Sequence, residues 1–291
     1  MEIILQWGLD VIRIIQQVQN PLLNSIFLAI TSLGSSMSFL LVLPLLFWCV
    51  DYNLGVRLTV LCCLSAFCNF FLKDFFSQPR PFEFDPGVAI GSARGYGLPS
   101  GHAQGSLILW GSIAVWAKKN WCWLLSAIVV VLIGFSRVYL GVHFPTDVLA
   151  GWAMGIAFLA LYLVLQPKIE SWITSQILSV QILLSLLVPL GMLLMHFTSF
   201  MVYQLGVLVG VGIGAALKVR YLPFSVRASG WRGFVRYIIG ITFMLGLFGM
   251  LRSAYPIQQT MSDIAIRFLL SVVNGVWMSL GALWLFRLLR L

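Results

Sequence analysis

The chain has 291 residues, of which 60% are hydrophobic and only 9% are charged. Soluble domains carry about 25% charged residues, so a chain of this composition cannot cover a surface that faces water. Its apolar runs are long and lack the alternation of polar and apolar residues that marks the strands of an outer-membrane barrel. The composition therefore predicts an all-α polytopic membrane protein.

The formal net charge of +9 is concentrated in short segments between the apolar runs. Basic residues in such segments indicate the cytoplasmic side of a membrane protein, and this distribution gives no reason to expect a nucleic-acid partner. Most of the 18 basic residues lie in Asp51–Arg57, Lys118–Asn120, Gln166–Ile169 and Lys218–Arg236, or at Arg287 and Arg290. We therefore expect these segments and the C-terminus to face the cytoplasm.

The first 35 residues are predicted to lie along the membrane surface. Residues 2–19 predict an amphipathic helix, because five apolar residues recur at helical spacing on one face: Ile4, Trp7, Val11, Ile14 and Val18. Asn20-Pro21 is expected to end that helix. The apolar run Leu22–Leu33 is too short to span a bilayer, which takes about 20 residues, and is predicted to be a re-entrant or interfacial continuation.

About nine transmembrane helices are predicted after this region, at 36–51, 54–75, 101–117, 121–139, 145–165, 177–196, 200–217, 236–252 and 264–286. An odd number of spans puts the two termini on opposite sides. The N-terminal helix is then expected on the non-cytoplasmic side of a bacterial inner membrane or an endoplasmic reticulum-like one. This organisation divides the chain into an interfacial region 1–35, a membrane core 36–170 and an additional four-span region 171–291.

Three glycines spaced by four, Gly206, Gly210 and Gly214, form a small-residue face on one predicted span. Such a face lets two helices approach closely in a membrane. It is interpreted as a packing face within the chain, with a homodimer seam as the alternative.

The string Pro99-Ser100-Gly101-His102 lies where a polar, glycine-rich loop meets an apolar helix. Ser100 is expected to cap that helix, with Gly101 and His102 in its first turn. The first N–H groups of a helix have no partner within it and lie at the positive end of its dipole, so they bind anions. The string predicts a phosphate site with a histidine beside it for proton transfer. The alternative interpretation is a capped helix with an interfacial histidine that has no catalytic role.

The string Ser136-Arg137-x5-His143-x3-Asp147 joins the end of one span to the start of the next. Pro145 suits the first position of a helix, which places His143 just before that helix and Asp147 in its first turn. A carboxylate there can bind one ring nitrogen of His143, fix its tautomer and leave the other nitrogen facing a substrate. A plain helix-start acid beside an interfacial histidine is the alternative interpretation.

Lys73 and Arg80-Pro81 form the third string, at the end of a long apolar run. Arg80 and Arg137 can each donate two hydrogen bonds to phosphate oxygens, while Lys73 acts as a point charge. An excess of cationic donors over carboxylates suits a phosphoryl-transfer transition state. Because all three strings lie at span ends on one predicted face, they indicate a phosphate-cleaving site at a membrane surface.

The three strings resemble the signature of the type 2 phosphatidic acid phosphatase superfamily, which runs Lys-x6-Arg-Pro, Pro-Ser-Gly-His and Ser-Arg-x5-His-x3-Asp. The chain matches this signature at every fixed position and in order, within about residues 36–165. Its nine predicted spans are similar to the glucose-6-phosphatase and sphingosine-phosphate phosphatase branches, whereas many bacterial lipid phosphatases of the superfamily have six.

The resemblance implies a phosphatase that works without a metal or cofactor. It implies that His143 attacks phosphorus and carries the phosphoryl group, that Asp147 orients it, and that His102 protonates the leaving group and then activates water. The phosphoryl oxygens would be held by Lys73, Arg80, Ser100, Gly101 and Arg137. The residues alone do not decide which histidine is the nucleophile.

The interfacial N-terminal helix and the membrane-surface site favour a lipid phosphate or pyrophosphate as substrate, with membrane lipids as partners. The loop Phe82–Leu98, which contains four glycines, is predicted to be a mobile lid whose Arg94 and Tyr96 contact the headgroup. Two alternatives stay open. A phosphotransferase would use the same intermediate with an acceptor hydroxyl, and an anion or phospholipid transporter would use the charged residues as a path.

Overall fold

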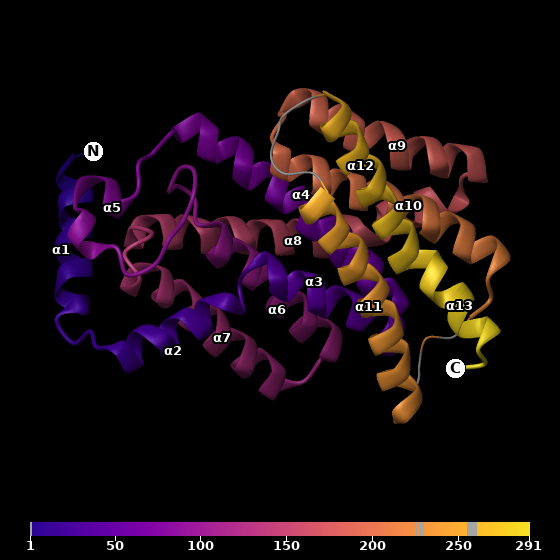
Figure 1. Cartoon of the computed structure of the whole chain (residues 1–291), viewed down its shortest axis with the longest axis horizontal. Helices are drawn as coiled ribbons and strands as arrows, with labels where there is room; N and C mark the ends of the chain where they lie inside the picture. The colour runs from indigo at the N-terminus through magenta and orange to yellow at the C-terminus, as the bar shows by residue number, and fades with distance from the viewer. Residues whose placement is uncertain (1, 225, 227–229, 255–260) are drawn as a thin grey trace. The chain divides into compact units, whose positions relative to one another are not determined.

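The computed structural model describes residues 2–224, 226, 230–254 and 261–291, and every regular element within these ranges is a helix (Figure 1). The predicted all-α class is confirmed for this part of the chain. Residues 225 and 227–229, which belong to the predicted basic loop Lys218–Arg236, lie outside the described residues.

The chain divides into two compact units, Met1–Phe39 with Leu64–Val164 and Leu40–Cys63 with Leu165–Leu291. Helices within the first unit are α1 (Glu2–Gln16), α2 (Pro21–Ser32), α5 (Pro81–Phe84), α6 (Gly101–Ala117) and α7 (Asn120–Tyr139). Three helices have residues in both units: α3 (Ser36–Leu45), α4 (Tyr52–Phe76) and α8 (Pro145–Ser175). Helices within the second unit are α9 (Leu178–Met195), α10 (Ser199–Tyr221), α11 (Trp231–Ala254), α12 (Met261–Val276) and α13 (Ala282–Leu288).

Within the described residues, seven helices are long and apolar enough to cross a membrane. They are Tyr52–Phe84, Asn120–Tyr139, Pro145–Ser175, Leu178–Met195, Ser199–Tyr221, Trp231–Met250 and Met261–Leu288. An eighth span results if Pro21–Ser32 and Ser36–Val50, which are bent by 48° at their break, cross together. The predicted span 101–117 is α6, whose 17 residues extend about 26 Å, at the short end of what a bilayer requires. The predicted number of nine is therefore not confirmed.

Helix α1 is apolar on two sides, which the sequence analysis did not anticipate. The side buried against the protein carries Leu5, Leu9 and Ile12, and it packs in a cluster with Phe144. The predicted apolar face points away instead, with the side chain of Trp7 about half exposed. The predicted helix also extended to residue 19, whereas α1 ends at Gln16. The periodicity showed an apolar stripe but not which stripe faces the protein, because that depends on the shape of the surface that α1 covers.

The break after α1 is confirmed at Asn20-Pro21. The side-chain oxygen of Asn20 accepts a hydrogen bond from the backbone N–H of Leu23 (2.9 Å), and Pro21 is the first residue of α2. Proline suits this position because its missing N–H would have no partner within the helix. A short interruption then separates α2 from α3, and a π-helical turn, Leu46–Val50, follows α3 just after Pro44.

Helices α6 and α8 approach each other closely beside two of the three strings of the sequence. A Cβ atom on Gly151 would lie 2.5 Å from the carbonyl oxygen of Ser100, and one on Gly155 would lie 3.2 Å from that of Gln104. These two glycines allow the backbones of α6 and α8 to meet at the start of both helices. The close approach brings Ser100 next to the first turn of α8.

In the second unit, α10 packs against α12 through the predicted glycine face. Cβ atoms on Gly206, Gly210 and Gly214 would lie 2.7 Å from Ser271, 2.1 Å from the carbonyl oxygen of Val272 and 2.0 Å from Ser279. The face is therefore filled by a helix of the same chain, as the primary interpretation expected. The alternative of a homodimer seam through these glycines stays a prediction.

Candidate active site

Ser100 caps α6 as predicted, and its backbone also contacts α8. Its side-chain oxygen accepts a hydrogen bond from the N–H of Ala103 (3.4 Å), and its own N–H donates to the carbonyl oxygen of Asp147 (2.9 Å). Gly101 follows in the first turn, where a Cβ atom would lie 3.1 Å from the side-chain oxygen of Asn69. The capped end of α6 and the first turn of α8 thus form one continuous wall.

A tight turn after α7 presents His143. Helix α7 ends at Tyr139, and Gly141 adopts a φ of +68°. A Cβ atom at Gly141 would lie 1.8 Å from the carbonyl oxygen of Val88, so only glycine fits. The N–H of His143 donates back to the carbonyl oxygen of Arg137 (3.3 Å) and closes the turn.

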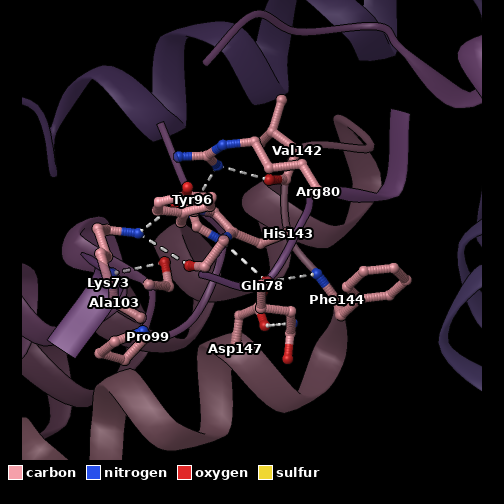
Figure 2. Close-up of polar contacts among 12 residues, drawn as sticks. Lys73, Gln78, Arg80, Tyr96, Pro99, Ala103, Val142, His143, Phe144 and Asp147 are labelled. Carbon is pink, nitrogen blue, oxygen red and sulfur yellow. Dashed lines mark hydrogen bonds and ion pairs between the residues drawn. The ribbon is translucent and has the colours of Figure 1, made fainter. Parts of the chain in front are cut away.

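The carboxylate of Asp147 binds the ring of His143, as the spacing predicted. Pro145 is the first residue of α8, which places Asp147 in its first turn. Oδ2 of Asp147 lies 3.1 Å from Nδ1 of His143 and accepts a hydrogen bond from the N–H of Phe144 (3.0 Å). Both residues are almost completely buried. Figure 2 shows these contacts.

The tautomer of His143 follows from its two neighbours. Nη1 of Arg80 lies 3.1 Å from Nε2 of His143, and a guanidinium group can only donate hydrogen bonds. Nε2 must therefore be the acceptor, and in the neutral ring the proton is on Nδ1, from which it donates to Asp147. This arrangement leaves the lone pair of Nε2 on the side of Arg80, away from the carboxylate.

The surroundings of His143 disfavour the charged form of its ring. Burial is the main cause that holds the pKa of this imidazole well below its usual value. The positive charges of Lys73, Arg80, Arg137 and His102 lower it further. The three predicted cations and His102 therefore all lie close enough to act on one ring, which joins the three sequence strings into one cluster.

Lys73 and Arg80 bind the backbone of the segment Arg94–Gly97, which we call the strap. The Lys73 ammonium donates to the carbonyl oxygens of Tyr96 (2.7 Å) and Gly97 (2.9 Å). Arg80 donates from Nε to Gly95 (2.6 Å) and from Nη2 to Arg94 (2.9 Å). Nη1 of Arg80 donates to the carbonyl oxygen of Val142 (2.7 Å). Carbonyl oxygens thus occupy most of the donors that were predicted to face phosphate.

The loop Phe82–Leu98, which was predicted to contact the headgroup through Arg94 and Tyr96, contains the strap. The side chains of Arg94 and Tyr96 are exposed, while their carbonyl oxygens face Arg80 and Lys73. In the structure these two residues therefore contact the site through their backbone. The predicted headgroup contacts of their side chains stay a prediction.

His102 lies in the first turn of α6, beside the break between α2 and α3. A Cβ atom on Gly34, which is in that break, would lie 3.5 Å from Cδ2 of the His102 ring and 2.7 Å from Ile133. The N-terminal region thus borders the second predicted histidine. A side chain at position 34 would therefore contact this edge of the ring.

Arg137 is also held by the N-terminal region. Its Nη1 donates to the hydroxyl oxygen of Thr31 in α2 (2.8 Å), and the side chain is 5% exposed. Its Nε is buried without a hydrogen-bond partner. A buried unpaired donor on a cation is costly, so an anion in this site would stabilise Arg137.

Helix α1 supports the turn that carries His143. The side-chain amide of Gln16 donates to the carbonyl oxygens of Val88 (2.9 Å) and Tyr139 (2.7 Å). Nε and Nη2 of Arg13 donate to one carboxylate oxygen of Asp85, at 3.0 and 2.8 Å. These contacts tie α1 to the end of α7 and to the segment Asp85–Val88, which lies against the turn at Gly141.

Three residues that contact the site were not predicted from the sequence. They are Thr31, Gln78, whose amide donates to Oδ1 of Asp147 (2.7 Å), and Asn69, whose amide donates to Gln104 (2.7 Å) and Pro99 (3.3 Å). Asn69 carried a usable signal, since it lies one helical turn before Lys73 in an apolar run. Thr31 and Gln78 carried none, because neither residue type nor spacing indicates a partner so far away in sequence.

The sequence matches two protein-family models. The model described as "PAP2 superfamily" matches residues 54–171, and the model described as "PAP2 superfamily phosphatase, transmembrane extension" matches residues 202–291. The first match contains all three strings of the candidate site. The second covers the helices α10 to α13.

Several curated proteins are similar over about half of the chain. Lipid phosphate phosphatase delta of Arabidopsis thaliana is 32% identical over 189 residues, 58% of this chain and 44% of that protein. Phosphatidylglycerophosphatase B of Bacillus subtilis is 31% identical over 168 residues, 53% of this chain and 80% of that protein. Lipid A 4′-phosphatase of Porphyromonas gingivalis is 33% identical over 174 residues, 54% of this chain and 71% of that protein.

Among solved structures, the crystal structure of a transmembrane PAP2-type phosphatidylglycerolphosphate phosphatase from Bacillus subtilis is similar. Its TM-score is 0.50 at 25% sequence identity, and the match covers 56% of this chain and 86% of that structure. The similarity therefore extends over most of the solved protein.

Proposed function

The chain belongs to the PAP2 superfamily of membrane phosphatases, and on that premise we propose that it hydrolyses a lipid phosphate or pyrophosphate through a phosphohistidine on His143. The hydrogen bonding of the His143 ring carries this proposal. Nδ1 donates to Asp147, and Nε2 presents a lone pair next to the donors of Arg80. A neutral imidazole fixed in this tautomer is a nucleophile at Nε2.

In the first step, the lone pair of Nε2 forms a bond to phosphorus while the bond from phosphorus to the leaving oxygen breaks. A protonated His102 gives its proton to that oxygen. The ring of His143 becomes positively charged when it is phosphorylated, and Asp147 stabilises that charge through Nδ1–H. In the second step, water attacks phosphorus and gives a proton to His102, and the electron pair of the broken P–N bond returns to Nε2.

The cationic side chains and the start of α6 would bind the phosphoryl oxygens. Arg80 lies beside the nucleophile, so its Nη1 can move from Nε2 to an oxygen of the attacked group. Arg137 has a buried Nε without a partner, and Ser100 and Gly101 bring the first N–H groups of α6. Lys73 keeps one of its three N–H groups beyond the two that bind the strap. Fixed donors of this kind stabilise the charge that develops on oxygen in the transition state.

We further propose a nine-span topology in which α6 and the segment Ser36–Val50 also cross the membrane. The basic segments then face the cytoplasm with the C-terminus, and the N-terminus and the site lie on the opposite side. The apolar side of α1 that faces away from the protein, with Trp7 and Ile14 exposed, supports a position in the membrane interface. In this topology the regions 1–35, 36–170 and 171–291 are an interfacial part, a catalytic core and a four-span addition.

The proposal is tested by phosphate release from detergent-purified protein in EDTA. The panel contains isoprenyl pyrophosphate, phosphatidate, phosphatidylglycerol phosphate, a sphingoid phosphate and glucose 6-phosphate, and His143→Ala is the control. We expect release from at least one lipid substrate, inhibition by vanadate, and no release by the variant. Loss of activity in EDTA, insensitivity to vanadate or an active His143→Ala variant would each contradict the histidine mechanism. Release that appears only when an acceptor alcohol is added would identify a phosphotransferase instead.

A further inference from the structure

The carboxylate of Asp147 has hydrogen-bond donors on both oxygens. Oδ2 faces the His143 ring and the N–H of Phe144, whereas Oδ1 faces the side-chain amide of Gln78 at 2.7 Å (Figure 2). Within the described part of the chain, Gln78 is the residue whose side chain binds Oδ1. Asp147 is fully buried, so its carboxylate is shielded from bulk solvent.

Gln78 is held in place by its own backbone. Helix α4 ends at Phe76, and Ser77 adopts a left-handed conformation with a φ of +48°, which turns the chain toward the site. The carbonyl oxygen of Gln78 then accepts a hydrogen bond from the N–H of Gly97 in the strap (2.8 Å). The amide of Gln78 is therefore directed at Asp147 by the turn that connects the end of α4, which carries Lys73, to Arg80.

The strap lies against the carboxylate of Asp147 at Gly97. A Cβ atom on Gly97 would lie only 2.9 Å from Oδ2 of Asp147, so the strap passes the carboxylate with bare backbone. A side chain at position 97 would push the strap or the carboxylate away. Gln78 reaches Oδ1 from the other side, and it does so without adding another charge beside Lys73 and Arg80.

We propose that Gln78 is a positioning residue that keeps the carboxylate of Asp147 aligned with Nδ1 of His143. This inference rests on the proposed function, because it assigns Gln78 a role only through the His143–Asp147 pair. The terminal torsion of an aspartate is broad, so a carboxylate bound on one oxygen alone can rotate. A rotated carboxylate would lose the hydrogen bond between Oδ2 and Nδ1. Without that bond the proton is no longer fixed on Nδ1, and the lone pair on Nε2 is no longer assured.

The effect should appear in the chemical step and not in substrate binding. Gln78 binds no part of the site that is expected to touch phosphate, so KM should change little. A displacement of about 1 Å in a catalytic group can cost roughly 100-fold in rate. We therefore expect Gln78→Met, which keeps the length of the side chain but removes the amide, to lower kcat by about 10- to 100-fold.

Two further variants separate positioning from general damage to the fold. Gln78→Glu keeps the shape and replaces the donor by an acceptor, and we expect kcat to fall at least as far as in Gln78→Met. Gln6→Met is the matched control, because Gln6 also donates to an aspartate, Asp10 (3.2 Å), but on the exposed surface of α1. Its kcat should equal that of the unmodified chain.

A double-mutant cycle with Asp147→Asn gives the decisive measurement. If Gln78 acts through Asp147, adding Gln78→Met to Asp147→Asn should lower kcat little further. If the two residues act independently, the fold losses in kcat of the two single variants should multiply in the double variant. Multiplying effects, an unchanged kcat in Gln78→Met, or a change confined to KM would overturn the inference. These outcomes are distinct from failure of the proposed function, which an active His143→Ala variant would reveal in the same assay.

Discussion

The two compact units of the chain bury their polar residues in different ways. In the first unit, buried charged residues are gathered at helix ends around His143. Lys73 and Arg80 donate hydrogen bonds to nearby backbone carbonyl oxygens, and Asp147 binds the ring of His143. In the second unit, α10 and α12 meet along glycines and serines that let two backbones approach. Under the proposed function, the first unit uses its buried polar residues for chemistry, whereas the contacts of α10 in the second unit serve close helix packing.

The sharpest way to break this comparison is to remove the nucleophile. We expect His143→Ala to lower kcat by at least about 10⁴-fold, because without the nucleophile no phosphohistidine can form. The measurement is phosphate release with the best lipid substrate. Thermal unfolding in detergent should show a folded protein; a folded variant that keeps its activity would remove His143 from the mechanism.

Arg80→Lys tests whether the geometry of the guanidinium matters beyond its charge. A lysine cannot bind Gly95, Val142 and His143 together, so we expect kcat/KM to fall by about 10²- to 10³-fold. Arg57→Lys is the matched control, because Arg57 makes a two-pronged contact with Glu170 in the second unit. Equal losses in the two variants would contradict the assignment of chemistry to the first unit.

Gly210→Ala tests the packing role of the second unit. A methyl group there would lie 2.1 Å from the carbonyl oxygen of Val272, so we expect destabilisation by about 1–3 kcal/mol with an unchanged kcat for the folded enzyme. Gly246→Ala in α11 is the control, because nothing lies within 4 Å of its Cβ position. In that helix alanine should stabilise by up to about 1 kcal/mol. Changes in melting temperature that have the same sign in both variants would argue against the packing role.

The smallest expected effect concerns the contact between Arg13 and Asp85. The hydrogen bonds from Arg13 hold the pKa of Asp85 below its usual value. A carboxyl whose pKa is lowered by folding contributes stability above its unfolded pKa and loses it as the pH falls through the folded pKa. We therefore expect Asp85→Asn to lower the melting temperature slightly at pH 7, and we expect this difference to disappear as the pH falls through the folded-state pKa of Asp85. A difference that persists in acid would show that the ion pair is not its cause.

Sequence patterns predicted the local geometry of the site where the partners are near in the chain. The cap at Ser100, the start of α8 at Pro145 and the contact from Asp147 to His143 are all confirmed. These features depend on the first turn of a helix, which spacing determines directly. The catalytic roles of these residues stay a proposal.

Sequence patterns did not predict the features that depend on which surfaces pack against each other in the folded chain. The buried side of α1 carries Leu9 and Ile12, because the ring of Phe144 lies against that side. The donors of Lys73 and Arg80 are directed to the strap, and hydropathy contains no information about a carbonyl oxygen 15 or more residues away.

Composition and short spacings were enough to establish a helical membrane protein, its family and the ends of the helices that carry the motifs, because these follow from hydrophobicity and from contacts within one helical turn. Tertiary structure alone decided that Thr31 binds Arg137, that Gln78 binds Asp147, and that α12 fills the glycine face of α10. Each of these contacts joins residues whose distance in space is set by how helices pack, and packing depends on the shapes of surfaces that no local pattern encodes.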